Sequence, residues 1–402
     1  QRPWTTTTRH GRALRVLAVF LCICTLIVGS VVVAEQPAQA LTRPIVATDQ
    51  THYSRYSLDS LRAQGYTGRG VVVAVLDGRI DTTIPELAGA HIELKSPCVP
   101  QRVEKSDRHA TFIAQVLVAR DFGLAPDATI YNYEMVREAL EGEGDCSTSW
   151  SRPGDLAQAP NLIEQAINDG ADIISISSTF SVPESQEMRW ALARAVVNGV
   201  IVVASMGNEG IENDPRSMGS WSGVVGVGAL EPDGTVASYS SWGDGVSVAA
   251  IGEVMVRSSI DGNDYIVNGT SMAAPVVAGT LALGKQRFGR EATTEQILQA
   301  LVATGSGAGQ WNNRTGYGEI DPAALLSSDP TALSNRHPFI GKGNGAKPTV
   351  QEISDYADGV VNPRVIMNDP SYVYRGTDEK NALRDGHKYP VHLGTSPRYH
   401  RD

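Results

Sequence analysis

Short, continuous apolar runs alternate with segments of helical periodicity through most of the chain. The run VVVAVL at residues 71–76 lies between a glycine and an Asp-Gly step, which predicts a strand buried on both faces. Further strands are predicted at residues 128–133, 172–177, 200–204, 224–227 and 246–250. Apolar residues at helical spacing predict helices at residues 109–119, 161–168, 184–198, 271–283 and 294–303.

This alternation of strands and helices is typical of βαβ units. We therefore expect an α/β fold with three layers, in which helices cover both faces of a mostly parallel central sheet. In such sheets ligands bind at the carboxyl ends of the strands. Functional side chains are thus expected directly after strands or at the starts of helices.

The N-terminal 40 residues have a different composition. Four arginines precede the first acidic residue, Glu35, and an uncharged apolar run fills residues 16–34. Ala38 and Ala40 then form a small-x-small pattern. These features predict a secretory signal over residues 1–40, and a secreted or cell-envelope protein. The alternative is an uncleaved membrane anchor, because the length of the run borders on that of a membrane span.

The rest of the chain divides into three parts by pattern. Residues 41–55 are predicted to be an N-terminal extension and residues 56–327 the main domain, with its alternating elements. From residue 328 the pattern fades, and residues 341–348 are linker-like in composition. Residues 328–402 form a polar tail, and either disorder or packing along the main domain is compatible with its sequence.

Charge and cysteine content restrict the ligands, the disulfide bonds and the metal sites that we expect. The formal net charge is -10, which argues against nucleic acid as a ligand. Beyond the predicted signal only Cys98 and Cys146 remain, and outside the cytosol two such thiols usually pair. The alternative is two unpaired thiols. A zinc site is not expected, because the cysteines are too few to supply its ligands.

Four polar residues stand where this fold would place a site. Asp77 follows the strand at residues 71–76, and His109 opens a predicted helix. Asn208 lies just beyond the strand at residues 200–204, and Ser271 begins a helix within the segment NGTSMAAP. Taken singly, each has an ordinary structural explanation as a turn residue, a surface histidine or a helix start.

The helix start at Ser271 carries two further features. We expect Thr270 to cap the helix and Pro275 to lie in its first turn, where a missing amide is tolerated. The small residues around Ser271, such as Gly269, allow close approach to its hydroxyl. A helix N-terminus also supplies free amides and partial positive charge, which favour a developing anion.

Together the four residues match the needs of acyl transfer. A serine attacks, a histidine moves the proton, an aspartate orients the histidine, and an amide with a backbone N–H holds the oxyanion.

These motifs resemble those of the subtilisin-like serine peptidases over residues 56–326. GTSMAAP at residues 269–275 matches the serine motif, and VAVLDGRID at 73–81 and HATFIA at 109–114 are similar to the aspartate and histidine motifs. ASMGNEG at 204–210 resembles the oxyanion segment, and IISISS at 173–178 the strand that pairs with bound peptide. Aspartate, histidine and serine also follow in this family's order along the chain.

The resemblance implies a role for each residue. Ser271 would be the nucleophile, His109 the general base, and Asp77 the residue that orients His109. Asn208 would donate to the oxyanion together with the Ser271 amide. The serines after the substrate strand, Ser177 and Ser178, would lie beside the substrate backbone. No cofactor is expected to be required. Calcium sites are common in the family, but no spacing in this sequence places one.

The chain departs from the family pattern after the aspartate. The family usually has Ser or Thr and then Gly there, whereas this chain has Gly78 and Arg79. Arg79 is expected either to pair with Asp77 or Asp81, or to crowd the site. Such a change puts catalytic efficiency in question more than the class of protein.

Three hypotheses follow. The leading one is a secreted serine endopeptidase that acts on proteins or peptides, with membrane contact only if the N-terminal segment is uncleaved. The second is an inactive binding protein that keeps the fold. The third is an envelope-associated processing peptidase similar to the mycosins, because a long pro-segment is missing between residue 40 and the first strand.

Overall fold

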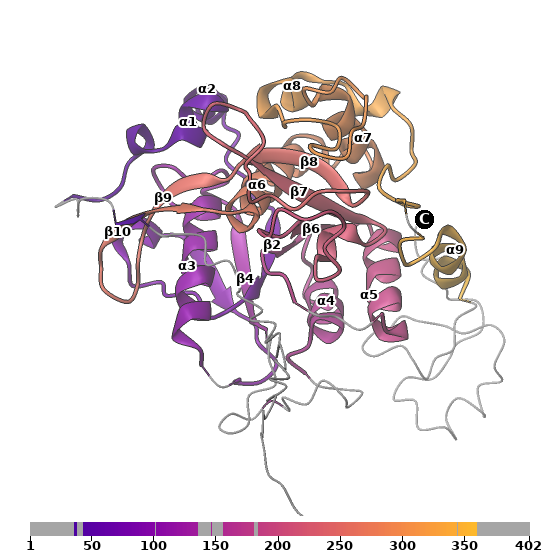
Figure 1. Cartoon of the computed structure of the whole chain (residues 1–402), viewed down its shortest axis with the longest axis horizontal. Helices are drawn as coiled ribbons and strands as arrows, with labels where there is room; N and C mark the ends of the chain where they lie inside the picture. The colour runs from indigo at the N-terminus through magenta and orange to yellow at the C-terminus, as the bar shows by residue number, and fades with distance from the viewer. Residues whose placement is uncertain are drawn as a thin grey trace, which may run out of the picture. The chain divides into compact units, whose positions relative to one another are not determined.

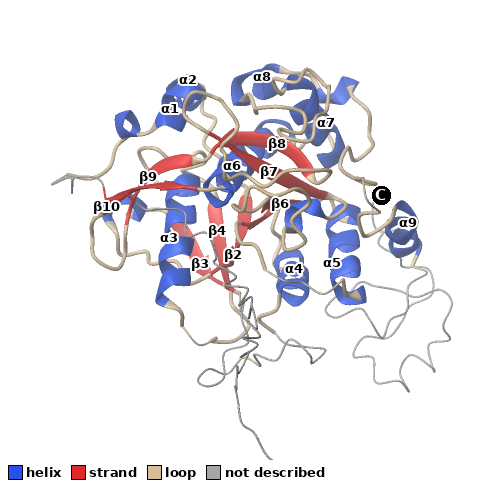
Figure 2. Cartoon of the chain, in the orientation of Figure 1, coloured by secondary structure: helices blue, strands red, loops and turns tan. Residues whose placement is uncertain are grey.

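A computed structural model describes residues 36–37, 43–100, 102–135, 146, 156–180, 184–343 and 345–359. Most of the predicted signal, including Ala38 and Ala40, and the tail from residue 360 onward lie outside the described residues. The course of the chain can be followed by colour in Figure 1, and the helices and strands are distinguished in Figure 2.

The centre of the fold is a seven-stranded sheet in which every neighbouring pair is parallel. Its strands, in spatial order, are β3 (His91–Leu94), β4 (Thr129–Glu134), β2 (Val72–Asp77), β5 (Ile173–Ile176), β6 (Ile201–Ser205), β7 (Val224–Leu230) and β8 (Val246–Ile251). A smaller antiparallel sheet contains β1 (Gln36–Pro37), β10 (Asp264–Asn268) and β9 (Glu253–Arg257).

Helices cover both faces of the central sheet, so the predicted three-layer α/β fold is confirmed (Figure 2). Alternate residues of β2 show the two faces. Val73 and Val75 pack with the core that contains α3 and α6, and Ala74 and Leu76 pack with the core that contains α4 and α5. The helices are α1 (Thr51–Arg55), α2 (Leu58–Ala63), α3 (Glu104–Val118), α4 (Ala159–Asn168), α5 (Gln186–Val197), α6 (Thr270–Phe288), α7 (Thr294–Thr304), α8 (Pro322–Ser327) and α9 (Val350–Asp358). Within the described part of the chain, none of them is long and apolar enough to cross a membrane.

The strands predicted from continuous apolar runs are all present, with ends that differ by a few residues. The start of α3 was predicted wrongly. This helix begins at Glu104, so His109 lies in its second turn and does not open it. The first five residues of α3 are EKSDR, and the apolar periodicity that reveals a helix starts only at Ala110.

The first part of the predicted polar tail packs on the main domain. Phe339 is buried in the core that contains α6 and α7. The Lys342 residue is half-buried as a whole, but its ammonium group is enclosed and donates to the carbonyl oxygens of Gly219 and Gly245 at 2.7 and 2.8 Å. These contacts hold the chain beside the segments that lead into β7 and β8.

Helix α9 completes this packing. Its Tyr356 is fully buried and lies against Trp190 of α5, with ring centroids 6.4 Å apart. Of the two alternatives that the sequence left open, packing along the main domain therefore applies to residues 328–343 and 345–359.

Candidate active site

Asp77 is the last residue of β2 and is fully buried at the carboxyl edge of the sheet. Its Oδ2 lies 2.9 Å from Nδ1 of His109, whose side chain is 25% exposed. A carboxylate can only accept, so Nδ1 carries the proton and Nε2 of His109 is left free to exchange a proton. The Asp77 Oδ1 accepts from the backbone amide of Gly78 at 2.7 Å. The buried carboxylate thus fixes both the orientation and the tautomer of the imidazole.

Ser178 supplies another hydrogen bond to the same carboxylate. Its hydroxyl donates to Asp77 Oδ2 at 3.1 Å, and its side chain is buried. Ser178 follows β5, which pairs directly with β2, so the carboxyl ends of these strands meet at one edge. The sequence suggested a place for Ser177 and Ser178 beside the substrate backbone, but it did not reveal this bond to Asp77.

The Gly78-Arg79 step has a packing explanation. A Cβ on Gly78 would overlap the backbone of α3, including the Asp107 amide nitrogen at 2.6 Å, so no side chain fits there. Among the described residues Arg79 forms an ion pair with Glu134, at 3.8 Å, a partner that the sequence did not suggest. The Arg79 backbone amide also donates to Asp107 Oδ1 at 2.8 Å. The departure from the family pattern therefore leaves the contact between Asp77 and His109 intact.

Ser271 is the second residue of α6, whose N-cap is Gly269. Thr270 does not cap the helix, contrary to the prediction, because it is itself helical. Its hydroxyl instead donates to Oδ1 of Asn208 at 2.9 Å and accepts from the amide of Gly207 at 3.1 Å. Pro275 lies one turn further into the helix than predicted. Its missing N–H removes the intrahelical partner of the Ser271 carbonyl.

Asn208 lies in the turn that follows β6. Its Oδ1 accepts two hydrogen bonds, one from the amide of Thr270 at 2.8 Å and one from the Thr270 hydroxyl. These bonds orient the side-chain amide, so its NH₂ group points away from Thr270. The Cβ position of Gly269 lies 3.1 Å from Asn208 Nδ2 and 2.9 Å from Ser271 Oγ. One small space therefore lies within reach of both the hydroxyl and an amide donor.

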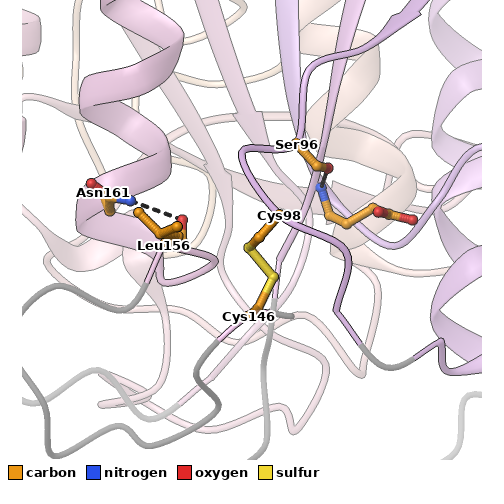
Figure 3. Close-up of a disulfide and its surroundings, with 6 residues drawn as sticks. Ser96, Cys98, Cys146, Leu156 and Asn161 are labelled. Carbon is orange, nitrogen blue, oxygen red and sulfur yellow. Dashed lines mark hydrogen bonds between the residues drawn. A yellow bond between two sulfur atoms is a disulfide. The ribbon is translucent and has the colours of Figure 1, made fainter. Parts of the chain in front are cut away.

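Cys98 and Cys146 form a disulfide between positions 48 residues apart (Figure 3). Both cysteines are buried and pack with Ala157. Ser96, close to Cys98 in sequence, accepts from the backbone amide of Glu134 at the end of β4, at 2.7 Å. The disulfide thus joins Cys98, which comes after β3 in the sequence, to Cys146, which comes after β4.

Among the residues that the structure describes, no group of three or more His, Cys, Asp or Glu side chains is placed to hold a metal ion. Structural calcium remains a prediction without an assigned site.

Comparison with known proteins places this chain in a family. The model of the Subtilase family matches residues 68–318, well over half of the chain. This match spans Asp77, His109, Asn208 and Ser271. The chain therefore belongs to the subtilase family of serine peptidases.

Individual relatives show the extent of the similarity. Subtilisin E of Bacillus subtilis (strain 168) is 32% identical over 239 residues, which cover 57% of this chain and 59% of that protein. M-protease of Shouchella clausii (strain KSM-K16) is 33% identical over 267 residues, covering 64% of this chain and 65% of that protein. The chain thus matches less than two thirds of the length of either relative.

Solved structures share the fold. MycP1 from the ESX-1 type VII secretion system superposes with a TM-score of 0.59 and 24% identity, over 76% of this chain and 92% of that one. The prenylagaramide maturation protease PagA gives a TM-score of 0.54 and 22% identity, over 67% of this chain and 97% of that one. At these identities the likeness concerns the fold alone.

Proposed function

We propose that this chain is a serine endopeptidase that hydrolyses peptide bonds through an acyl-enzyme intermediate. The observation that carries the proposal is the contact between Asp77 Oδ2 and His109 Nδ1, in a chain whose Ser271 and Asn208 border one common space. This arrangement supports the roles that the family resemblance implies. Nothing in the chemistry that follows requires a cofactor.

In the proposed reaction, Ser271 Oγ attacks the carbonyl carbon of the scissile peptide bond while His109 Nε2 accepts its proton. The negative charge that develops on the carbonyl oxygen is stabilised by Asn208 Nδ2 and by the Ser271 amide at the positive end of α6. The imidazolium is stabilised by Asp77. It then protonates the leaving amine, and an ester between the substrate acyl group and Ser271 remains.

Hydrolysis of that ester repeats the sequence with water. His109 removes a proton from the water as it attacks the acyl carbon, and then returns a proton to Ser271 Oγ. The hydrogen bond from Ser178 to Asp77 Oδ2 helps to hold the carboxylate in place through both halves of the reaction.

The substrates we propose are proteins or peptides in a secreted or cell-envelope setting. The signal predicted over residues 1–40 and the disulfide between Cys98 and Cys146 support the proposal of export, since disulfides persist mainly outside the cytosol. On this proposal residues 56–327 are the peptidase domain. The similarity in fold to MycP1 keeps an envelope-associated processing role as the alternative setting.

The non-catalytic alternative rested on the Gly78-Arg79 departure. The packing of Gly78 against α3 and the ion pair of Arg79 with Glu134 account for that departure without loss of the site. Catalysis is therefore the better supported function.

The test is turnover of internally quenched peptides blocked at both ends, so that only internal cleavage gives a signal. We expect the mature protein to cleave such peptides and Ser271→Ala to reduce the rate by more than about 10³-fold. Binding of the same peptides without cleavage by the folded wild-type protein would reverse the choice and favour the binding protein.

A further inference from the structure

Three charged side chains form a network at the turn that follows β6. We call this turn, residues 206–210, the oxyanion turn because it carries Asn208. Arg216 lies 2.7 Å from Glu209 through its Nη2, and the same nitrogen donates to Asp214 Oδ2 at 2.9 Å. Its Nε and its backbone amide both donate to Asp214 Oδ1, at 3.1 and 3.0 Å. The Asp214 residue is fully buried, whereas the other two side chains are half-buried. Asp214 thus anchors Arg216, and Arg216 holds Glu209.

Glu209 connects this network to Asn208. Its Oε2 accepts from the backbone amide of Asn208 at 3.0 Å. Asn208 is therefore held at two places, by Glu209 at its backbone and by Thr270 at its side-chain oxygen. The direction of its Nδ2 depends on both.

Gly207 shows how closely the turn lies over the two carboxylates. A Cβ at this position would be 3.0 Å from Asp214 Oδ2 and 3.1 Å from Glu209 Oε2. Its φ of +101° is one that residues with side chains rarely adopt. The turn can therefore rest on the network only because residue 207 is a glycine.

The network contains two carboxylates, and it needs the positive charge of Arg216 to hold them together. Burial raises the pKa of Asp214, but the hydrogen bonds from Arg216, a hydrogen bond with Glu209 and the charge of Arg216 together outweigh burial and hold that pKa below its usual value. The hydrogen bond to Asp214 in turn raises the pKa of Arg216. Without the guanidinium, two neighbouring carboxylates would repel each other, and Glu209 would turn outward to water.

The backbone of the same residue also contacts the segment that follows β5. The Arg216 carbonyl accepts from the backbone amide of Phe180 at 3.1 Å. Phe180 follows Ser177 and Ser178, the serines at the end of β5. Arg216 therefore contacts both the segment that follows β5, through its carbonyl, and Glu209, through its side chain.

We propose that Arg216 and Glu209 are positioning residues that hold the Asn208 amide in place for the oxyanion, with Asp214 as their anchor. This inference rests on the proposed function, because it assigns the network to the same reaction. It predicts that loss of either side chain lowers kcat and leaves KM nearly unchanged, because the oxyanion forms only as the reaction proceeds.

The kinetic test compares Arg216→Ala and Glu209→Ala with wild type on the blocked peptides. Loss of an oxyanion donor costs about 10²–10³-fold in kcat, and a displaced donor keeps part of its effect, so we expect a loss on the order of tenfold. Arg216→Lys should recover part of it, since an ammonium group restores the charge but not the planar fork. The matched control is Arg189→Ala. Arg189 lies on α5 and pairs with Glu352 of α9 at 2.9 Å, and its loss should leave kcat unchanged.

A double-mutant cycle shows whether Glu209 acts through Asn208. In an Asn208→Ala background, Glu209→Ala should have almost no further effect on kcat, because the donor that it positions is gone. An equal loss in both backgrounds would overturn the inference, as would a rise in KM with kcat unchanged.

A second measurement does not depend on activity. Hydrogen exchange of the Asn208 backbone amide should be slow in wild type and at least about tenfold faster in Glu209→Ala, because its acceptor is lost. Unchanged exchange would overturn the inference whatever the kinetics. A wild-type protein without turnover, but with this difference in exchange, would instead contradict the proposed function and leave the positioning network supported.

Discussion

The substitution Gly269→Ala would separate activity from stability. Gly269 has φ 164° and ψ 157°, an extended backbone that any residue adopts, so alanine brings little backbone strain. Its methyl group, however, would lie 2.9 Å from Ser271 Oγ and 3.1 Å from Asn208 Nδ2, where ordinary contacts of a Cβ begin near 3.4 Å. The nucleophile must therefore move by about half an ångström, or rotate away from the space that it shares with the amide.

The cost follows from that displacement. A misplacement of about 1 Å in a catalytic group can cost 10²-fold in rate, so we expect kcat to fall by about 10- to 100-fold. The free energy of unfolding should change by less than about 1 kcal/mol, because a Gly-to-Ala change at a compatible backbone also removes freedom from the unfolded chain. The assays are kcat on blocked, internally quenched peptides and urea unfolding of the same preparations.

The matched control is Gly284→Ala, on the same helix. A Cβ there would meet Ile297 and Leu325 side-chain carbons at 3.4 and 3.6 Å, which are ordinary contacts, so both activity and fold should be kept. Full kcat in Gly269→Ala would refute the reasoning. A loss of several kcal/mol of stability in Gly269→Ala would also refute it, because the damage would then not be local.

Three further predictions concern the surroundings of the site. Ser178→Ala should lower stability by about 1–2 kcal/mol and kcat several-fold, because it removes the hydrogen bond to Asp77. Ser177→Ala should change kcat less, because the Ser177 hydroxyl has no hydrogen-bond partner in the described structure. Equal effects of the two substitutions would contradict the assigned bond. Replacement of Cys98 and Cys146 by alanine should cost about 3–4 kcal/mol in urea unfolding, and an unchanged midpoint would argue against the bridge. Burial lowers the pKa of Lys342 from 10.5 to about 7, so unfolding takes up a proton between these values and stability should rise with pH across that window. Lys342→Met should flatten this rise, and an identical pH profile would contradict the burial of the ammonium group.

The sequence predicted the strands of the central sheet that are buried on both faces. β2 and β6 are mostly continuous apolar runs, and such runs can be recognised in the sequence without knowledge of their neighbours in the fold. The edge strand β3, His91–Leu94, was not predicted, because its residues are mostly exposed and its apolar positions are too few. The hairpin of β9 and β10 is only half-buried and was missed for a similar reason.

The candidate residues of the site were predictable because each follows a strand or lies near a helix start, and the carboxyl ends of parallel strands meet. The hydrogen bonds and ion pairs that hold these residues in place were not predictable in the same way. Thr270 was expected to cap α6, but its hydroxyl donates to Oδ1 of Asn208, 62 residues away in sequence. The partners of Arg216 depend on how one turn folds back on itself, and apolar periodicity carries no signal for that. The bond from Ser178 to Asp77 depends on the pairing of β5 with β2, and the sequence predicted no strand order.

The central claim is that Ser271 is an activated nucleophile. Fluorophosphonate labelling of the purified mature protein, followed by identification of the labelled residue, tests it most directly, with Ser271→Ala as the control. We expect one label, on Ser271, that is lost in the control and strongly reduced in His109→Ala, because the imidazole must take the proton. A folded wild-type protein that takes no label, or takes it equally in Ser271→Ala, would contradict the account.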